Sequence, residues 1–484
     1  MPPFDPAAYA GGGAIGLFVP GSGQTASRKG ALASLVRGKV EPSSLGGVPS
    51  GRPLISLARH PAEVTIYVAL PPPGKHANTK RYPIAIVGGG YRGILTSGST
   101  RIRGLVSIAD IAPTANAIDA GKHPVIGSRV DKRAVAHLKR LDHRMSRTHD
   151  ARLWATLILV GSVRGGALLA FGFRSAYLGR AGLLAAPAVL AASLTLSALG
   201  ISSVSTVVAL LAALTVGSSL AVAAARRALP YALVAIVIAY LVVFSTWPEV
   251  NSLAVIGARP DGGGRFYGAG NLTETVLLAV SLEAAALLGR RAILPVLALS
   301  LVTIGWSRAG ADGGGIVVFL AAFGVLAARM YHVRVTPRRV ALALVAGIVL
   351  VGALVGLDAA TGGSSHVTRA FRTGPVSLAE ELAHRVHISA SGLGASWLQA
   401  AVFTVSIVAL AVLATRRPRF AAGDALLAGL AVSLLVNDSP GDVASAGALS
   451  FAVLWAYERV QAPMREAARA DSVRADAASI SSRA

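Results

Sequence analysis

Apolar stretches of membrane-spanning length recur from Leu153 onward, separated by short links that carry arginine or glycine. A helix needs ~20 apolar residues to cross the roughly 30 Å hydrocarbon core of a bilayer, so the repeated pattern predicts a bundle of spanning helices. About eleven stretches qualify: 153–173, 181–200, 204–225, 229–247, 272–289, 292–306, 315–332, 339–357, 398–415, 420–436 and 442–458. The sixth and eleventh are short and the first contains Arg164, so ten or twelve spans also fit the pattern.

Composition agrees with this fold class. Hydrophobic residues make up 53% of the chain and charged residues 14%, which is too apolar for a soluble globule. The formal charge of +23 favours the anionic headgroups of a lipid bilayer as partners and requires no nucleic acid. The chain has no cysteine, which excludes disulfides, thiolate zinc sites, iron–sulfur clusters and cysteine nucleophiles.

The arginines of the links predict the orientation, because cytoplasmic loops accumulate Lys and Arg. Eighteen arginines fall after odd-numbered stretches or in the tail, against six after even-numbered stretches. We therefore expect a multi-pass protein of the bacterial plasma membrane with residues 1–151 outside. Residues 459–484 are expected to form a disordered cytoplasmic tail.

Residues 1–151 have a different character from the transmembrane domain predicted at 152–458. Residues 1–130 are expected to form a small α/β segment, with strands at Val64–Leu70, Pro83–Val87 and Leu105–Ile108. Residues 131–151 read as a basic amphipathic helix, with Val135, Leu138 and Met145 at helical spacing, lying on lipid headgroups. Alternatively, the first apolar stretch is not a full span and the N-terminal part is cytoplasmic.

No signal peptide is recognisable at the start. Met1–Pro6 lacks a basic region, and Ala7–Gly16 is too short and glycine-rich for an apolar one. The N-terminal segment is therefore translocated without a signal peptide, or the true start lies upstream.

A glycine motif in the α/β segment invites a nucleotide-binding interpretation. Gly88, Gly90 and Gly93 match G-x-G-x-x-G, and Asp110 lies where a ribose-binding acid would fall. The motif needs a following helix, but ILTSGSTRIRG is a poor helix former, so we expect no dinucleotide cofactor.

Metal-dependent hydrolysis is also disfavoured. A two-metal site needs about six Asp or His ligands, and residues 1–100 offer only these candidates: Asp5, Glu41, His60, Glu63 and His76. His137, His143 and His149 are spaced six apart and would spread around a helix as titrating surface residues. We expect no metal and no catalytic residue in this segment.

Four glycine-rich polar motifs lie in the membrane half, at 258–271, 307–315, 361–371 and 437–442, all on the expected outer face. Non-helical polar backbone at membrane depth is tolerated where it lines a wet cavity, so the motifs predict one outward-opening site. The candidate binding residues are Arg265, Tyr267, Asn271, Arg308, Asp312, His366, Arg369, Asn437 and Asp438. The cationic members could face an anion, and the acids, with Asp442, could bind a cation or shuttle protons. Plain turns between spans are the alternative.

Three charged residues fall inside predicted spans: Arg164, Glu283 and Asp424. A charge in lipid is costly unless it is paired or faces water, so each is a functional candidate. An Arg164–Glu283 bridge would be a purely structural explanation. Residues 376–388 are expected to form a short amphipathic helix on the outer surface.

The run RYPIAIVGGGYRGILTSGSTRIRGLVSIADIAPT, residues 81–114, resembles the C-terminal part of alkaline-phosphatase-like and sulfatase-like domains. The resemblance implies a truncated, incomplete copy of that fold, without its catalytic part.

The motifs GRFYGAGN, GADGGG, SSHVTRAF and NDSPGD together resemble a family of large uncharacterised actinobacterial-type membrane proteins. That resemblance covers most of residues 60–458 and implies an exported N-terminal part, but no activity. WSRAG, residues 306–310, is similar to a motif of O-antigen ligases, although the long loop lacks their His-Asn pairing.

The leading hypothesis is an outward polar site that handles an anionic envelope substrate, such as a lipid- or glycan-linked phosphate. The first alternative is a secondary transporter in which Glu283, Asp312 and Asp438 couple proton or cation movement. The second is a non-catalytic envelope protein with a degenerate phosphatase-like domain.

Overall fold

The computed structural model describes residues 6–21, 25–37, 63–262, 265–334, 397–417, 419–437 and 439–481, with scattered positions between 336 and 356. The chain forms two compact units. The N-terminal unit contains Met1–Leu153, Ser193–Val208 and Thr246–Gly268, and the helical unit contains Trp154–Ala192, Ala209–Ser245 and Ala269–Ala484.

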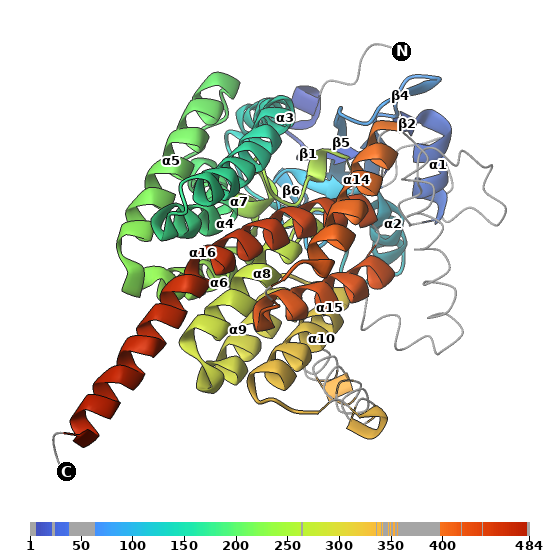
Figure 1. Ribbon diagram of the computed structural model, residues 1–484. Coiled ribbons are helices and arrows are strands. Elements are labelled where there is room, and N and C mark those ends of the chain that lie inside the picture. The colour runs from blue at the N-terminus through green and yellow to red at the C-terminus, as the bar shows by residue number, and fades with distance from the viewer. Residues whose placement is uncertain are drawn as a thin grey trace. The chain divides into compact units, whose positions relative to one another are not determined.

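A mixed β-sheet forms the centre of the N-terminal unit (Figure 1). Its central strand, β1 (Gly13–Val19), pairs antiparallel with β5 (Tyr82–Gly88) and parallel with β6 (Gly93–Ser97) and β7 (Leu105–Ser107). The outer strands are β3 (Val64–Val68), beside β5, and β8 (Ile126–Arg129), beside β6. A separate ribbon joins β2 (Thr25–Ser27) to β4 (Lys75–Ala77).

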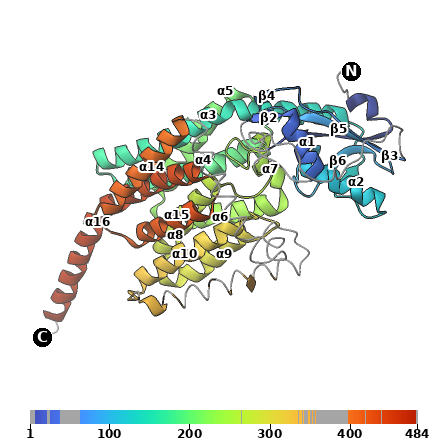
Figure 2. The same cartoon turned by 90° about the vertical axis from the view of Figure 1, so that its right-hand side faces the viewer.

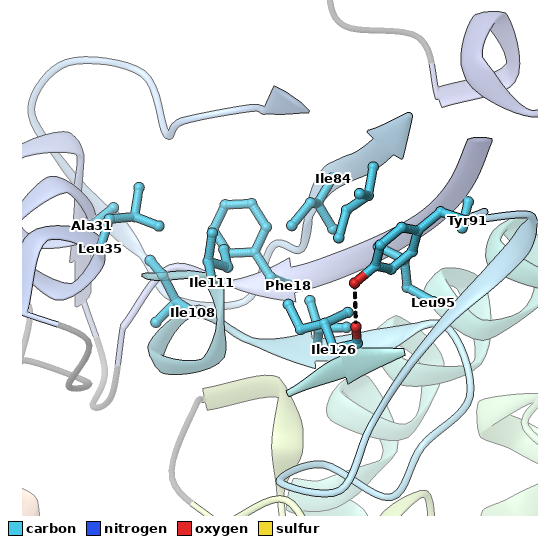
Figure 3. Packing of buried hydrophobic residues seen from close by; sticks show 12 residues of the cluster. Phe18, Ala31, Leu35, Ile84, Tyr91, Leu95, Ile108, Ile111 and Ile126 are labelled. Atoms are coloured by element: carbon cyan, nitrogen blue, oxygen red, sulfur yellow. Dashed lines mark hydrogen bonds between the residues drawn. The ribbon is translucent and has the colours of Figure 1, made fainter. Parts of the chain in front are cut away.

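Helices cover both faces of the sheet. Successive side chains of a strand point to opposite faces, so each strand contributes to both of the layers beneath the helices. Ala14 and Phe18 of β1 lie in the core beneath α1 (Arg28–Arg37) and α2 (Ile111–Asp119), as Figure 3 shows for Phe18. The intervening residue Ile15 packs on the other face against α3 (Ala134–Gly172). All seven residues of β1 are buried, as expected for a strand between two layers.

The expected amphipathic helix is the first part of α3, and its apolar face has a protein partner. Leu138, Leu141 and Met145 are buried against the sheet beside Ile15. The helix runs without a break to Gly172, so residue 151 is not a helix end. Residues 134–151 are helical, and the headgroup contact of the basic face stays a prediction.

Three predicted strands correspond to β3, β5 and β7, whereas β2, β4, β6, β8 and the central strand β1 were missed. The segment GAIGLFV contains two glycines and no polar alternation, because both of its faces are buried. The glycine-rich stretch rejected as a signal region therefore leads into the central strand.

The helical unit contains the remaining long helices: α4 (Ala176–Ala198), α5 (Val204–Ala224), α6 (Leu229–Thr246), α8 (Asn271–Leu288), α9 (Ile293–Gly305), α10 (Gly313–Met330), α14 (Trp397–Thr415), α15 (Ala421–Val436) and α16 (Pro440–Ser481). The ends of α4, α5 and α6 that fall in 193–208 and at Thr246 belong to the N-terminal unit, which also holds the short α7 (Pro248–Ser252). Among the described residues, seven helices are long and apolar enough to cross a membrane: Ala134–Gly172, Ala176–Ala198, Val204–Ala224, Arg226–Thr246, Asn271–Leu288, Gly313–Met330 and Trp397–Thr415. The protein is therefore mostly helical with a small N-terminal α/β region, while α15 is shorter than a full span. The stretches expected at 339–357 and 376–388 lie largely or wholly outside the described residues.

Helix α8 positions the candidate site. Helix α8 is buried from Thr273 to Ala285, and it packs against α9, α10, α15 and α16 (Figures 1 and 2). Helix α16 continues to Ser481, where a disordered tail was expected from residue 459. The sequence there is rich in Ala and Arg, which have high helix propensity.

Candidate functional site

Three of the four glycine-rich motifs meet at one end of the helical unit, where α8 and α10 begin and α15 ends. The backbone N–H of Ala269 donates to the carbonyl of Gly310 at 3.0 Å, which joins the first motif to the second. Asn437 Nδ2 donates to Glu274 Oε2 at 3.0 Å, which joins the end of α15 to the first turn of α8. We call Glu274, Asp312 and Asn437 the polar junction.

Backbone geometry explains the glycines of the second motif. Asp312 is the N-cap of α10, and its Oδ1 accepts a hydrogen bond from a first-turn backbone N–H at 3.1 Å. A Cβ at Gly310 would lie 2.4 Å from the carbonyl oxygen of Ile304. A Cβ at Gly314 would lie 3.2 Å from Asn437 Oδ1. Glycine therefore permits the close approach of α9, α10 and α15 that forms the polar junction.

The polar junction is buried. Its residues are 1% (Glu274), 4% (Asp312) and 7% (Asn437) exposed. A buried carboxylate requires hydrogen bonds or charges that compensate its lost hydration. Asp312 and Asn437 were expected from sequence, and Asn271 begins α8 three residues before Glu274. Glu274 itself was missed, although an acid in the first turn of an apolar stretch was a usable signal.

The other acid of α8, Glu283, lies on the opposite side of the helix from Glu274. It is also 1% exposed. Nine residues separate it from Glu274, which in an α-helix corresponds to about 13 Å along the axis and about half a turn around it. The buried helix α8 therefore carries one carboxyl group on each of two opposite sides.

A small cavity of about 20 Å³ lies beside Glu283. Its lining comes from α3, α4, α6, α8 and α16 and is apolar except for Glu283 and Ser450. Pro187, inside α4, also lines the cavity, as does Leu183. Proline has no N–H, so the Leu183 carbonyl lacks its usual helical donor. A volume of this size holds about one water molecule.

The cationic candidates are not gathered in the described part of the helical unit. Arg308 is exposed. Arg265 and Tyr267 belong to the N-terminal unit, where the guanidinium of Arg101 lies 3.8 Å from the centroid of the Tyr267 ring. The remaining candidates lie outside the described residues: His366, Arg369 and Asp438.

The other two charged residues of the predicted spans have different surroundings. Arg164 is exposed, and no ion pair joins it to Glu283 among the described residues. Asp424, near the start of α15, pairs with Arg329 at 2.9 Å and with Arg419 at 3.0 Å. The charge of Asp424 is therefore balanced by arginines of neighbouring segments.

The N-terminal unit contains a carboxylate that sequence inspection missed. Asp261 lies in a short 3-10 turn, and its oxygens accept hydrogen bonds from the guanidinium of Arg152 at 2.8 and 2.9 Å. His149 Nδ1 lies 2.7 Å from the same carboxylate. Burial alone would raise the pKa of Asp261, but the hydrogen bond and charge of Arg152, followed by those of His149, lower it to about 2. His149, expected only as a surface residue, therefore also contacts the buried carboxylate of Asp261.

The G-x-G-x-x-G run forms a strand-to-strand turn. Gly88 ends β5 and Gly93 begins β6, so a strand, and not the helix that the motif requires, follows these glycines. Asp110 accepts hydrogen bonds from the hydroxyls of Ser97 and Ser99. Ser97, Ser99 and Asp110 are therefore hydrogen-bonded to one another within the run.

The described chain therefore defines a class, a multi-helical protein whose membrane-length helices enclose buried carboxyl groups. Within the described residues, no group of three or more His, Asp or Glu side chains could hold a metal ion. Comparisons with protein-family models, with curated proteins and with solved structures found no match.

Proposed function

We propose that the protein is a secondary transporter of the bacterial plasma membrane, in which the buried carboxyl groups of α8 bind and release a proton or cation. The observation that carries the proposal is the position of Glu283, 1% exposed and beside a cavity. A charge in such surroundings is costly unless it is compensated, so an intramembrane acid in a protein interior is typical of proton relays and coupling sites.

A proton is the coupling ion that the cavity favours. Glu283 is the titratable residue among those that line it, and Ser450 contributes a hydroxyl. When the carboxyl group holds a proton, its O–H can donate to the Leu183 carbonyl or to one water in the cavity. When Glu283 releases the proton, its carboxylate can accept hydrogen bonds from the Ser450 hydroxyl and from the same water.

The experiment uses N,N′-dicyclohexylcarbodiimide, which modifies carboxyl groups that hold a proton in apolar surroundings. The full-length protein in lipid vesicles is treated at pH 6 and pH 9, and modified peptides are identified by mass spectrometry. We expect modification of the α8 peptide at Glu283, weaker at pH 9 and lost in Glu283→Gln. Glu458→Gln, on α16, is the matched control and should label as the wild type does.

Transport is tested separately in the same vesicles, with an internal pH-sensitive dye and an imposed membrane potential. Wild-type protein should admit protons faster than vesicles without protein, and Glu283→Gln should not. Carbodiimide labelling without proton flux would leave Glu283 as a buried structural acid and contradict the transport proposal.

A second candidate function, handling of an anionic envelope substrate, has one observation in its favour. The bonds from Ala269 to Gly310 and from Asn437 to Glu274 bring three of the outward motifs together. The resemblances to the actinobacterial-type family, to alkaline-phosphatase-like domains and to O-antigen ligases belong to this proposal. Asn437→Ala should then alter envelope glycans or phospholipids in a complemented deletion strain, and an unchanged envelope would exclude it.

We also propose eleven spans with the C-terminus in the cytoplasm. The opposite directions of α10 and α15 support it. The polar junction lies at the start of α10 and the end of α15, on the side expected to face outward. Arg329 and Asp424 pair at the opposite ends of these two helices, on the side where arginines are expected to face the cytoplasm. The chain has no cysteine, so single cysteines can be introduced directly. In intact cells, an impermeant maleimide should label Arg308→Cys and not Arg416→Cys.

A further inference from the structure

Five exposed arginines lie near the ends of α10 and α14, the start of α15 and the middle of α16. Arg329 is near the end of α10, Arg416, Arg417 and Arg419 form the link between α14 and α15, and Arg459 lies in α16. We call these five residues the arginine rim. The acids within 416–424 and 455–459 are Asp424 and Glu458, so the rim and these acids carry a formal charge of +3, five minus two.

Contacts fix the positions of several of these guanidinium groups. Asp424, with its side chain 14% exposed, pairs with Arg329 and Arg419 and so holds α10 against the α14–α15 link. Arg459 donates to the Arg417 carbonyl at 3.4 Å. The rim is therefore a positioned set of charges.

A pair of aromatic rings lies beside one arginine of the rim. The rings of Phe171 and Trp455 stack with centroids 5.7 Å apart. The guanidinium of Arg459 lies 5.3 Å from the Trp455 ring and 5.6 Å from the Phe171 ring. A guanidinium held over aromatic faces keeps its outer N–H groups available for an anion.

A cavity of about 10 Å³ opens between these residues, lined by Arg416, Arg419, Asp424 and Trp455 among others. The indole Nε1 of Trp455 is buried and has no acceptor among the described residues. Indole is a donor only, and arginine is a donor only. Both carboxylate oxygens of Asp424 already pair with arginines. The cavity has room for about one oxygen atom and its lining presents surplus donors, so its complement is one oxygen of an anionic group whose remainder lies outside it.

The surrounding surface indicates where that anion comes from. Helix α14, which ends at the rim, exposes Val405, Val408 and Val412, and Phe171 is 46% exposed. Apolar side chains of a membrane-length helix that lead to arginine and tryptophan are typical of the lipid–water interface. Basic pockets between helices at that depth bind phospholipid headgroups.

From these observations we propose that the arginine rim and the Trp455 N–H bind the phosphodiester of an anionic phospholipid. Arg416 and Arg419 supply the charge, and the indole N–H donates to a phosphate oxygen. The site lies at the opposite ends of α10 and α15 from the polar junction and does not depend on the proposed transport.

The experiment measures lipid retention by the purified full-length protein in detergent, using native mass spectrometry. Phosphatidylglycerol and phosphatidylcholine are titrated separately, and inorganic phosphate is added as a competitor. The test variant combines Arg416→Gln with Trp455→Phe, which keeps the aromatic stack but removes the N–H. Arg291→Gln, an exposed arginine of another link, is the matched control.

We expect the wild type and Arg291→Gln to retain phosphatidylglycerol in preference to phosphatidylcholine, and the double variant to lose about ten-fold in affinity. Equal retention of the two lipids, or wild-type affinity in the double variant, would overturn the proposal. Displacement of the lipid by inorganic phosphate at similar concentration would assign the site to free phosphate instead. Elution of each variant at the wild-type volume in size-exclusion chromatography checks that it is folded.

Discussion

Replacing Asp261 with asparagine measures what one buried carboxylate contributes to the N-terminal unit. The Asp261 side chain is 5% exposed, and its pKa falls from 3.8 to about 2 through its contacts with Arg152 and His149. At ~1.36 kcal/mol per pH unit, a difference of about 1.8 units (3.8 minus 2) corresponds to about 2.4 kcal/mol, or about sixty-fold in an equilibrium constant. Losing the charge should therefore open the contact about sixty-fold more often at neutral pH.

Hydrogen–deuterium exchange with mass spectrometry reads this opening directly. Peptides that cover residues 145–155 and 255–262 of Asp261→Asn should exchange about sixty-fold faster than those of the wild type, while peptides of the sheet change less. Asp150→Asn is the matched control, because Asp150 is exposed on α3, the helix that carries His149 and Arg152. Exchange in Asp261→Asn within two-fold of that control would refute the reasoning.

The dependence on pH has a definite sign. Because the folded pKa of Asp261 lies below its unfolded value, the stabilisation is complete above about pH 5 and is lost as the pH falls from 3.8 toward 2. The apparent melting temperature of the wild type should fall over that window more steeply than that of Asp261→Asn. Parallel curves for the two proteins would show that this carboxylate is not the group responsible.

Three packing contacts give further expectations, each measured as an apparent melting temperature in detergent. Gly166→Ala should lower it, because a Cβ there would lie 2.5 Å from Cα of Gly182, whereas Gly165→Ala, with nothing within 4 Å, should not. Leu138→Ala should cost about 2–5 kcal/mol, since the side chain is buried against the sheet, and an unchanged melting temperature would contradict the packing of α3. Gly310→Ala should destabilise the start of α10 through its contact with a backbone carbonyl at 2.4 Å, and wild-type stability would mean that the α9–α10 link can shift.

Hydropathy predicted most of the long helices because their apolar lengths are a local property of the chain. Helices α4, α5, α6, α8, α10 and α14 begin and end within a few residues of the predicted stretches. The boundary of α3 was not predictable in this way. Its first half is polar enough to look separate, and only the packing of Leu138 and Met145 on the sheet shows that one helix serves two environments.

The candidate site was predictable only in part, because its contacts join distant segments. Asp312 and Asn437 stood out as polar residues beside glycine. Glu274 did not, since its partner Asn437 lies 163 residues away. Asp261 was likewise passed over, because its partners His149 and Arg152 are more than a hundred residues earlier in the chain. Burial of an acid is a property of the fold and leaves no periodic signal in the sequence.

The burial of α8 bears on how the protein is made. Among the seven membrane-length helices α8 has the lowest mean hydropathy, 1.4, and it carries both Glu274 and Glu283. If these helices span a membrane, as proposed, an acid near the middle of an isolated helix opposes its release into lipid by about 2.5–3.5 kcal/mol. We therefore expect this segment to leave the insertion machinery together with its neighbours, so that synthesis of α10 and α15 precedes its final placement. Early-stage truncations ending just after Leu288 should leave α8 uninserted, in a glycosylation-mapping assay, while those ending after Val436 should not.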